Sequence, residues 1–264
     1  MSTTAAAAPV GSLLREWRTR RRVSQLELSA ETGVSTRHLS FIETGRARPS
    51  REMVMRLAEY LDLPLRERNA LLLSAGYAPE YTQMPLSAES MRGVRRSLQA
   101  LVDAHQPCPA LVVDHAWDLV LANDAVFVMA DGMPDELMSD PINVIRLLMH
   151  PRGLRGRITN FEDYSAHVMH RLHRQERATG DVAIRDLVRE CESYPGIGRP
   201  GNVHGPIEPV MPIRMSMNGL ELSFFTIVST LGTPYDVTLA EIAIESFFPA
   251  DAQTAAAIGM AVAG

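Results

Sequence analysis

The chain has 264 residues, of which 46% are hydrophobic and 22% charged, and its two cysteines do not form a CxxC pair. This composition favours two globular domains in a reducing compartment and excludes a disordered chain, a disulfide framework and a zinc site built on paired cysteines. The net charge of −5 is unevenly divided, since residues 1–80 carry 12 Arg and 9 acidic residues whereas residues 81–264 carry 14 Arg and 22 acidic residues.

Positive charge is concentrated near the beginning of the first segment, where four arginines fall within five positions: Arg18, Arg20, Arg21 and Arg22. A small basic segment beside an acidic one is typical of a DNA-facing module joined to a second domain, although a solvated helix end explains the cluster equally well. Residues 1–10 lack the basic and apolar regions of a signal peptide, and we expect them to be disordered. No run approaches 18 apolar residues, so we expect a cytoplasmic protein without a membrane segment, located on the nucleoid when bound to DNA.

Residues 11–76 are predicted to form five short helices. Apolar residues at helical spacing indicate the first, and the next three each follow a serine suited to the N-cap position, namely Ser24, Ser35 and Ser50. Glu27 completes a capping box with Ser24, and Gly33 suits the left-handed conformation that ends a helix before a tight turn. The fifth helix is expected to follow Pro64.

The two helices within residues 25–43 have the layout of a helix-turn-helix unit, in which one helix braces the next against the major groove. Residues 23–61 read VSQLELSAETGVSTRHLSFIETGRARPSREMVMRLAEYL, and through SQxxL, SxxxLSxIExG and RxRPS this string resembles the XRE/Cro/C1 helix-turn-helix family. The resemblance implies that residues 11–76 form an all-α, lambda-repressor-like domain that binds a double-stranded DNA operator as part of a homodimer.

The resemblance assigns DNA contacts to eight residues, namely Gln25, Ser35, Thr36, Arg37, His38, Ser40, Phe41 and Arg46. Gln25 and Arg46 are expected at phosphates. Thr36 and Arg37 are expected at base edges, where an arginine that donates two bonds to guanine contributes roughly 1–3 kcal/mol of discrimination. Phe41 would either touch a thymine methyl group or pack inward, and His38 would either reach DNA or stay uninvolved.

The same resemblance pairs Arg18 with Glu43 in a partly buried ion pair. Removing one partner of such a pair strands the other charge and costs about 3–5 kcal/mol. The alternative is that Arg18 is a surface arginine of the basic cluster, in which case its loss costs far less.

Residues 77–87 contain two prolines and no helical period, which predicts a linker to a second domain over residues 88–264. A helix is expected over residues 88–104, with an apolar stripe of Met91, Val94, Leu98, Leu101 and Val102. The remaining pattern predicts a hairpin from residues 110–114 and 118–122, helices at 124–130, 143–150, 161–177 and 183–194, and strands at 208–215, 221–231 and 240–248.

This order predicts an α+β domain with a five-stranded antiparallel sheet that helices cover on one face. The run LSFFTIVSTL within residues 221–231 is apolar on both faces, so we expect that strand to be central. In the last strand, Ile242, Ile244 and Phe248 alternate with Glu241 and Glu245, which predicts one buried face and one face in water.

The second half resembles the MmyB-like ligand-binding domain, a PAS-type fold, in the strings VVDHAWDLVLAN, NVIRLLMHPRGLRGRITNFED and ELSFFTIVSTLGTPYDVTLAEIAIESFFPAD. Together the two resemblances cover about residues 11–253. They imply a transcription factor without a cofactor, whose cavity holds a small apolar, fatty-acid-like effector. Binding of that effector would shift the dimer between arrangements that span different half-site spacings.

Six residues are candidates for the ligand site, namely Trp117, Asn123, Met129, Arg146, Met149 and Phe224. Trp117 and Asn123 would form an apolar wall with one polar anchor, and methionines suit an adaptable apolar cavity. Arg146 could receive a carboxylate head group through two hydrogen bonds. Each has a plainer alternative, which is core or sheet-edge packing for the apolar residues and a basic surface for Arg146.

Catalytic and metal chemistry find little support in the sequence. His167, His170 and His173 lack the i, i+4 spacing of helical zinc sites, and His150, which could bind haem, is more simply a capping or hydrogen-bonded residue. We expect no metal site and no enzyme, because no nucleophile motif is present. Two alternatives to ligand control stay open: a second domain that serves only for dimerisation or protein docking, and a haem or redox sensor.

Overall fold

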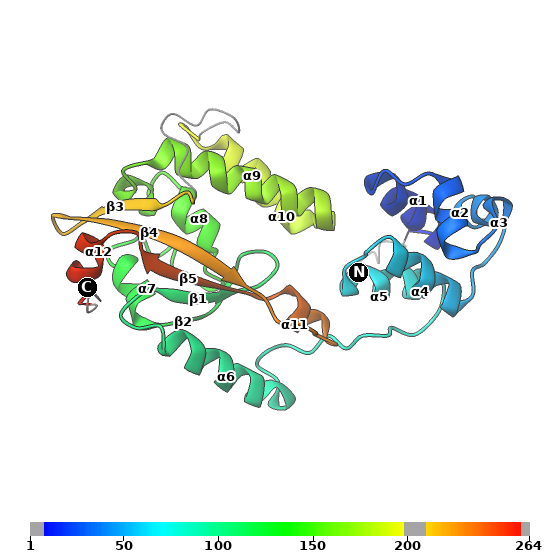
Figure 1. Cartoon of the computed structure of the whole chain (residues 1–264), viewed down its shortest axis with the longest axis horizontal. Helices are drawn as coiled ribbons and strands as arrows, with labels where there is room; N and C mark the ends of the chain where they lie inside the picture. The colour runs from blue at the N-terminus through cyan, green and yellow to red at the C-terminus, as the bar shows by residue number, and fades with distance from the viewer. Residues whose placement is uncertain (1–7, 198–209, 260–264) are drawn as a thin grey trace, which may run out of the picture. The chain divides into compact units, whose positions relative to one another are not determined.

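The structure is a computed structural model that describes residues 8–197 and 210–259. The chain divides into two compact units (Figure 1). Unit 1 comprises the described residues up to Gln83 together with Pro234–Val237, and unit 2 comprises the other described residues. Most of the N-terminus predicted to be disordered, residues 1–7, lies outside the described residues, but Val10 is already the first residue of a helix.

Unit 1 contains the five predicted helices, which are α1 (Val10–Arg20), α2 (Gln25–Thr32), α3 (Thr36–Glu43), α4 (Arg51–Tyr60) and α5 (Leu65–Ser74). The serine caps form as expected, because the side-chain oxygens of Ser24, Ser35 and Ser50 each accept a hydrogen bond of 3.0–3.2 Å from the backbone amide three residues later. Gly33 ends α2 with a φ of +69°. The all-α helix-turn-helix arrangement is confirmed.

Close packing of α1 against α3 fixes the helix predicted to read DNA. A β-carbon at Gly11 of α1 would lie 2.1 Å from the carbonyl oxygen of Ile42, so only glycine fits this crossing. The core beside it contains side chains that are at most 4% exposed, namely Leu14, Trp17, Leu28, Leu39 and Ile42. The orientation of α3 is therefore set by contact of its backbone with α1 as well as by side-chain packing.

Residues 77–82 are held on unit 1, although the sequence predicts a linker over residues 77–87. The side-chain oxygen of Asn69 accepts hydrogen bonds from the backbone amides of Glu80 and Tyr81, and its nitrogen donates to the carbonyl of Tyr81. The Thr82 hydroxyl donates to the carboxylate of Asp236 at 2.7 Å, within the segment 234–237 that belongs to the same unit. The chain is therefore fixed to unit 1 as far as Thr82.

Unit 2 is built on one antiparallel sheet, and its strands are β1 (Ala110–Val113), β2 (Leu119–Ala122), β3 (Ile213–Met217), β4 (Leu220–Ser229) and β5 (Ala243–Pro249). Their order across the sheet is β2-β1-β5-β4-β3, so the last strand joins the two hairpins. This confirms an α+β domain with five antiparallel strands. Of the strand predicted at residues 208–215, positions 208 and 209 lie outside the described residues.

The strand predicted to be central, β4, is an interior strand between β5 and β3, although the middle position of the five strands belongs to β5. The apolar residues on the two faces of β4 make different contacts. Phe224 is 1% exposed in the core, whereas Phe225 on the opposite face stacks on Phe248 of β5 at 5.4 Å between ring centroids. Towards its end β4 leaves the core, since Ile227 and Val228 are 47% and 45% exposed.

Glu245 in β5 is buried, contrary to the prediction that it faces water. Its side chain is paired with Arg171, a residue 74 positions earlier in the chain. The strand also begins later than predicted, because Glu241 ends the helix α11 (Val237–Glu241). Alternation along one strand cannot reveal a buried ion pair whose other partner lies on a distant helix.

Helices cover both faces of the sheet, whereas the sequence predicts cover on one face (Figure 1). On one face, Leu111 and Val113 share a core with helices α8 (Val144–Met149), α9 (Phe161–Thr179) and α10 (Val182–Ser193) and with the short turn η2 (Leu154–Arg157). On the other face lies α6 (Arg92–Asp103), which follows the short turn η1 (Glu89–Met91). Leu101, predicted on the buried stripe of this helix, is 47% exposed. Two more short helices are α7 (Asp124–Met129) and α12 (Ala252–Ala257).

Candidate functional site

The beginning of α3 forms an exposed edge of unit 1. Leu39 and Ile42 on the inner face of the helix are completely buried. Thr36 and Arg37 face outward and are exposed. The guanidinium carbon of Arg37 lies 5.4 Å from the centre of the half-buried Phe41 ring, within the range of a cation–π contact. Phe41 therefore supports Arg37 while part of its ring stays accessible.

The other residues predicted to contact DNA lie along or beside this edge. Ser35 caps α3, while His38 and Ser40 are half-buried on the first turns of the helix. Arg46 is exposed in the loop that follows, and its backbone amide donates to the carbonyl of Phe41 at 2.7 Å. This bond attaches the loop to the end of α3, so Arg46 is presented next to the helix.

A largely buried ion pair connects α1 to α3. Arg18 donates from Nε and Nη2 to the two carboxylate oxygens of Glu43 at 2.7 and 3.0 Å, and from Nη1 to the carbonyl of Val23 at 2.9 Å. The side chains of Arg18 and Glu43 are 14% and 2% exposed. The alternative of a surface arginine is therefore wrong.

Gln25 is part of the same cluster, because its side-chain amide donates to Oε2 of Glu43 at 2.7 Å. Burial by itself raises the pKa of Glu43, but the hydrogen bonds from Arg18 and Gln25 outweigh burial and hold that pKa below its ordinary value. The ionised carboxylate thus ties α1, α2 and α3 together. A phosphate contact of Gln25 stays a prediction.

Unit 2 contains a pocket lined only by apolar residues, among them Leu111, Leu119, Met129, Leu148, Ile213 and Phe247. The lining comes from β1, β2, β3, β5, α7, α8 and η2, so it lies on the face of the sheet that α8 and η2 cover. The cavity volume is about 50 Å³. That is room for roughly four water-sized spheres, well below the ~300 Å³ of a small drug-binding pocket.

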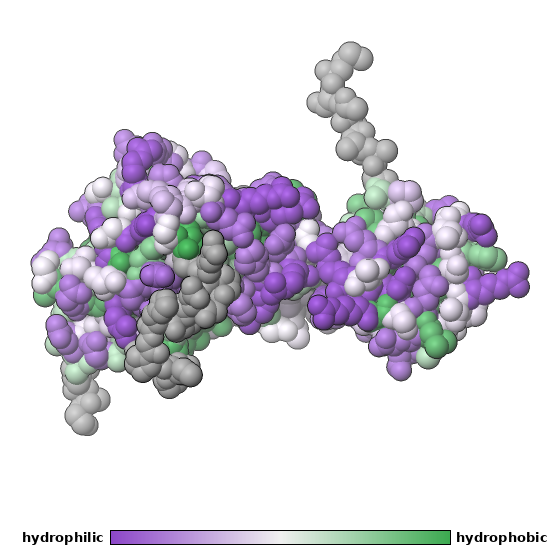
Figure 2. Space-filling model, turned by 90° about the horizontal axis from the view of Figure 1, so that it is seen from above, coloured by the Kyte–Doolittle hydropathy of each residue, from purple (hydrophilic) through white to green (hydrophobic). Residues whose placement is uncertain are grey.

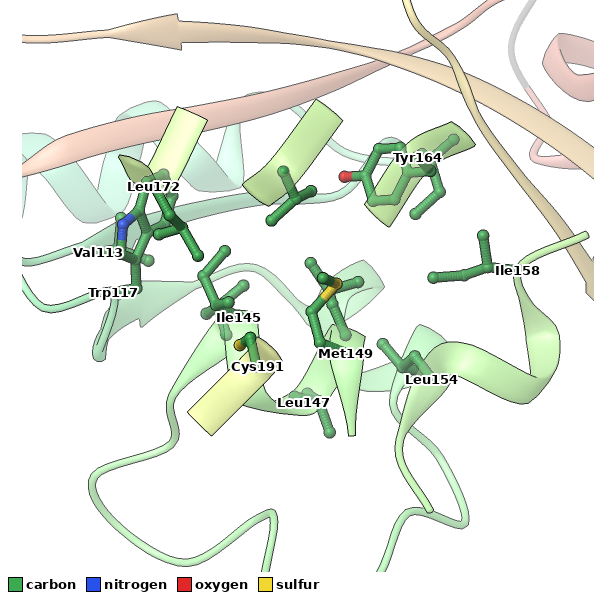
Figure 3. Packing of buried hydrophobic residues seen from close by; sticks show 14 of the residues in the cluster. Val113, Trp117, Ile145, Leu147, Met149, Leu154, Ile158, Tyr164, Leu172 and Cys191 are labelled. Carbon is green, nitrogen blue, oxygen red and sulfur yellow. The ribbon is translucent and has the colours of Figure 1, made fainter. Parts of the chain in front are cut away.

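Of the six residues predicted for the ligand site, Met129 lines this pocket and the other five lie outside it. Figure 3 shows Trp117 beside Val113 and Leu172, and Met149 within the same packed cluster. Met149 is fully buried. Phe224 lies directly behind the pocket wall, since its ring meets the lining residue Phe247 edge to face at 6.4 Å.

Trp117 and Asn123 make structural contacts instead. The indole nitrogen of Trp117 donates to the side-chain oxygen of Gln175 at 2.8 Å, and the guanidinium of Arg171 lies 4.1 Å from its ring. Asn123 is 1% exposed and bonds only to backbone groups, which are the carbonyls of Val102 and Cys108 and the amide of Ala110. A ligand would have to break these bonds to use Asn123 as an anchor.

Arg146 is also engaged. It donates two hydrogen bonds to Glu190, at 2.6 and 2.8 Å, and the hydroxyl of Tyr194 donates to the same carboxylate. The hydrogen bond to Glu190 raises the pKa of Arg146, and that from Arg146 lowers the pKa of Glu190. A carboxylate ligand at Arg146 would therefore have to displace Glu190.

For the pocket-lining residues that were not predicted, the sequence contains one local signal. Helix α7 reads DAVFVM, and five apolar residues out of six exceed what one buried helix face needs. Phe127 of this helix lines the pocket together with Leu148 and Phe247 from distant segments. For Leu148 and Phe247 no such signal exists, because each is one apolar residue in a generally apolar run.

The histidines of α9 lie on its polar side, and the surface over α9 and α10 is largely hydrophilic (Figure 2). His167 and His170 are exposed, and His173 lies 3.2 Å from Glu192. Nδ1 of His150 accepts a hydrogen bond from the backbone amide of Arg152 at 3.1 Å. Within residues 8–197 and 210–259, no group of three or more His, Cys, Asp or Glu side chains could hold a metal ion.

Comparison with known proteins identifies both units. Residues 14–68 match a helix-turn-helix family, and residues 94–259 match the family described as the MmyB-like transcription regulator ligand binding domain. The second match covers more than half of the chain. The protein belongs to the MmyB-like transcription regulator family. Among the described residues of this MmyB-like regulator, no helix is long and apolar enough to cross a bilayer.

Over 102 residues this MmyB-like regulator is 32% identical to proteins of Mycobacterium bovis and Mycobacterium tuberculosis that are named uncharacterized HTH-type transcriptional regulators. The matched segment is 38% of this chain and 40% of each relative, so the match spans less than half the length of these relatives. A solved RNA-binding light-oxygen-voltage receptor aligns with 91% of this chain and 58% of its own at 12% identity, with a TM-score of 0.26, which is too low to compare the folds.

Proposed function

We propose that this protein is a sequence-specific, DNA-binding transcriptional regulator in which α3 reads base edges. The observation that carries the proposal is the exposed Arg37 at the start of a helix that the Arg18–Glu43 pair and the contact at Gly11 fix in place. A guanidinium presented in this way can donate two bonds to one guanine in the major groove. The names of the mycobacterial relatives support the same function.

Arg37→Ala is expected to relax the sequence preference. The affinity for the operator should fall by roughly 5- to 150-fold, equivalent to about 1–3 kcal/mol, while binding to a scrambled duplex changes little. Gln25→Ala should weaken both duplexes alike. Arg51→Ala removes an exposed guanidinium that pairs with Glu80, and it should change the affinity for neither the operator nor the scrambled duplex.

Fluorescence titrations of the operator and of the scrambled duplex give the ratio of affinities for each variant. If Arg37→Ala kept the wild-type ratio, a different part of α3 would face the bases. The same titrations give the stoichiometry. We propose a homodimer on an inverted repeat with half-sites about one helical turn, ~34 Å, apart, which predicts two chains on each operator duplex.

The apolar pocket of unit 2 is the proposed site for a small apolar, fatty-acid-like effector. Its fully apolar lining and the ligand-binding family of this domain support the proposal. Effector binding would change the half-site spacing that the dimer spans, with a coupling free energy on the order of 1–3 kcal/mol. A cavity at this place also favours ligand binding over a domain that only docks proteins.

Fatty acids are expected to stabilise the protein against heating. At 100 times the dissociation constant, binding contributes about 2.7 kcal/mol, enough to raise the melting temperature of unit 2 by several degrees. Leu148→Phe fills the pocket and should abolish the shift, whereas Leu101→Phe, the same change at an exposed leucine of α6, should retain it. Calorimetry over a series of chain lengths measures the shift. Fatty acids that change neither melting temperature nor operator affinity would rule out this ligand class.

A further inference from the structure

One wall of the apolar pocket differs from the others in how it is built. Six lining residues come from the continuous segment 126–142, namely Val126, Phe127, Met129, Ala130, Met138 and Ile142. Helix α7 begins this wall, and none of its six residues is buried. Most of the other lining residues come from strands and from α8, in which five of six residues are buried. The wall at α7 is therefore the one with the least packing behind it.

Phe127 lies where the pocket meets the surface. Its side chain lines the cavity and is nevertheless 47% exposed, and its neighbour Val128 is 64% exposed. A residue with both properties separates the cavity from solvent. Movement of α7 would thus open the pocket directly to water.

At its N-terminus α7 has no side-chain cap, because the side chain of its N-cap residue, Asn123, hydrogen-bonds to other segments and so fixes that end of the helix. At the other end, Arg157 donates from Nη1 to the carbonyl of Met129 at 2.7 Å and from Nη2 to the carbonyl of Asp131. Arg157 ends η2, whose Leu154 lines the pocket from another side. One guanidinium therefore ties the wall at α7 to the wall at η2.

We propose that α7 is the gate of the effector pocket, with Phe127 as its closing side chain and Arg157 as the latch that keeps it shut. The proposal rests on the proposed ligand-binding function of unit 2. A cavity of about 50 Å³ cannot take up a long hydrocarbon chain unless a wall moves. Segments with few buried contacts are those that open locally at the smallest free-energy cost, and α7 is such a segment.

Thiol labelling tests the gate without any effector. Leu148→Cys places a thiol in the lining, and its rate of reaction with N-ethylmaleimide reports how often the pocket opens. The native Cys191 is an internal control, because it is fully buried in the core and burial raises the pKa of its thiol to about 12. Its thiol is therefore expected to react only when unit 2 unfolds globally.

In the Leu148→Cys background, Arg157→Ala is expected to speed labelling at position 148 by ~10-fold or more, since two charge-assisted hydrogen bonds are lost, without changing the labelling of Cys191. The labelling rate of Arg157→Lys at position 148 should lie between those of the parent protein and of Arg157→Ala, because an ammonium group cannot donate from two nitrogens as a guanidinium does. Arg189→Ala removes an exposed arginine of α10 that pairs with Asp186 and should have no effect.

An unchanged rate at position 148, or equal acceleration at position 148 and Cys191, would overturn the proposal. If Leu148→Cys does not fold, hydrogen exchange in Arg157→Ala alone replaces it, and faster exchange confined to the amides of residues 124–131 is expected. Exchange in that segment at the wild-type rate would also overturn it. Neither readout needs a ligand. The test of the gate therefore gives a result even if fatty acids do not bind, and the two proposals can fail independently.

Discussion

Glu43→Ala is expected to lower the free energy of unfolding of unit 1 by about 3–5 kcal/mol, because it leaves the guanidinium of Arg18, 14% exposed, without its carboxylate. Arg18→Ala should cost a similar amount, since it strands a carboxylate that is only 2% exposed. The chain offers a reporter for each unit, as Trp17 lies in unit 1 and Trp117 in unit 2. Urea unfolding followed by fluorine NMR of 5-fluorotryptophan protein should show an early transition at Trp17 alone.

The double variant Arg18→Met/Glu43→Leu is the control for this result. Replacing both charges with apolar groups leaves no charge stranded. The Gln25 amide and the Val23 carbonyl each lose one hydrogen bond, so the double variant should cost less than either single change but more than nothing. If the single variants lost less than about 1 kcal/mol, the pair would contribute no more than an ordinary surface ion pair.

The same pair predicts a pH dependence. Because the pKa of Glu43 is lower in the folded protein than in the unfolded chain, its contribution is complete above the ordinary carboxyl pKa of ~4.3 and is lost as the pH falls through the lowered value. The stability difference between wild type and Glu43→Gln should therefore shrink from about pH 6 to about pH 3. A constant difference would contradict an ionised Glu43.

Asn123→Ala is expected to destabilise unit 2 by about 3 kcal/mol or more. The substitution removes three hydrogen bonds, to the carbonyls of Val102 and Cys108 and from the amide of Ala110, in a site that is 1% exposed, and each lost bond costs roughly 1 kcal/mol or more. The unfolding transition reported by the fluorine signal of Trp117 should move to a lower urea concentration, while the transition reported by Trp17 stays unchanged.

Asn160→Ala is the matched control for Asn123→Ala. Asn160 also bonds only to backbone, at Pro212 and Arg214, but it is half-buried, so water can replace its bonds and the cost should be smaller. If Asn123→Ala instead kept full stability and removed the response to fatty acids, Asn123 would be a ligand anchor after all.

Unit 1 is predictable from sequence because its signals are local. Ser24, Ser35 and Ser50 each mark a helix start through a bond to an amide three residues away, and Gly33 marks an end through its own backbone geometry. The Arg18–Glu43 pair spans 25 residues, and it came from the family resemblance rather than from spacing.

Unit 2 is less predictable because its decisive contacts are long-range. The number and type of strands follow from periodicity, but the position of β5 between β1 and β4 does not. Glu245 looks exposed in the sequence because its partner, Arg171, lies on another element. Among the predicted ligand-site residues, Met129 alone lines the pocket. The polar candidates Asn123 and Arg146 form hydrogen bonds with other parts of the protein, which sequence patterns do not reveal.

Equilibrium binding of the full chain to genomic fragments, at several salt concentrations, tests most directly whether α3 reads DNA. If α3 reads DNA, at least one fragment should bind ~10³-fold more tightly than a scrambled duplex, with an affinity that falls steeply between about 50 and 200 mM salt. Binding that does not discriminate between any fragments, or that does not depend on salt, would contradict it.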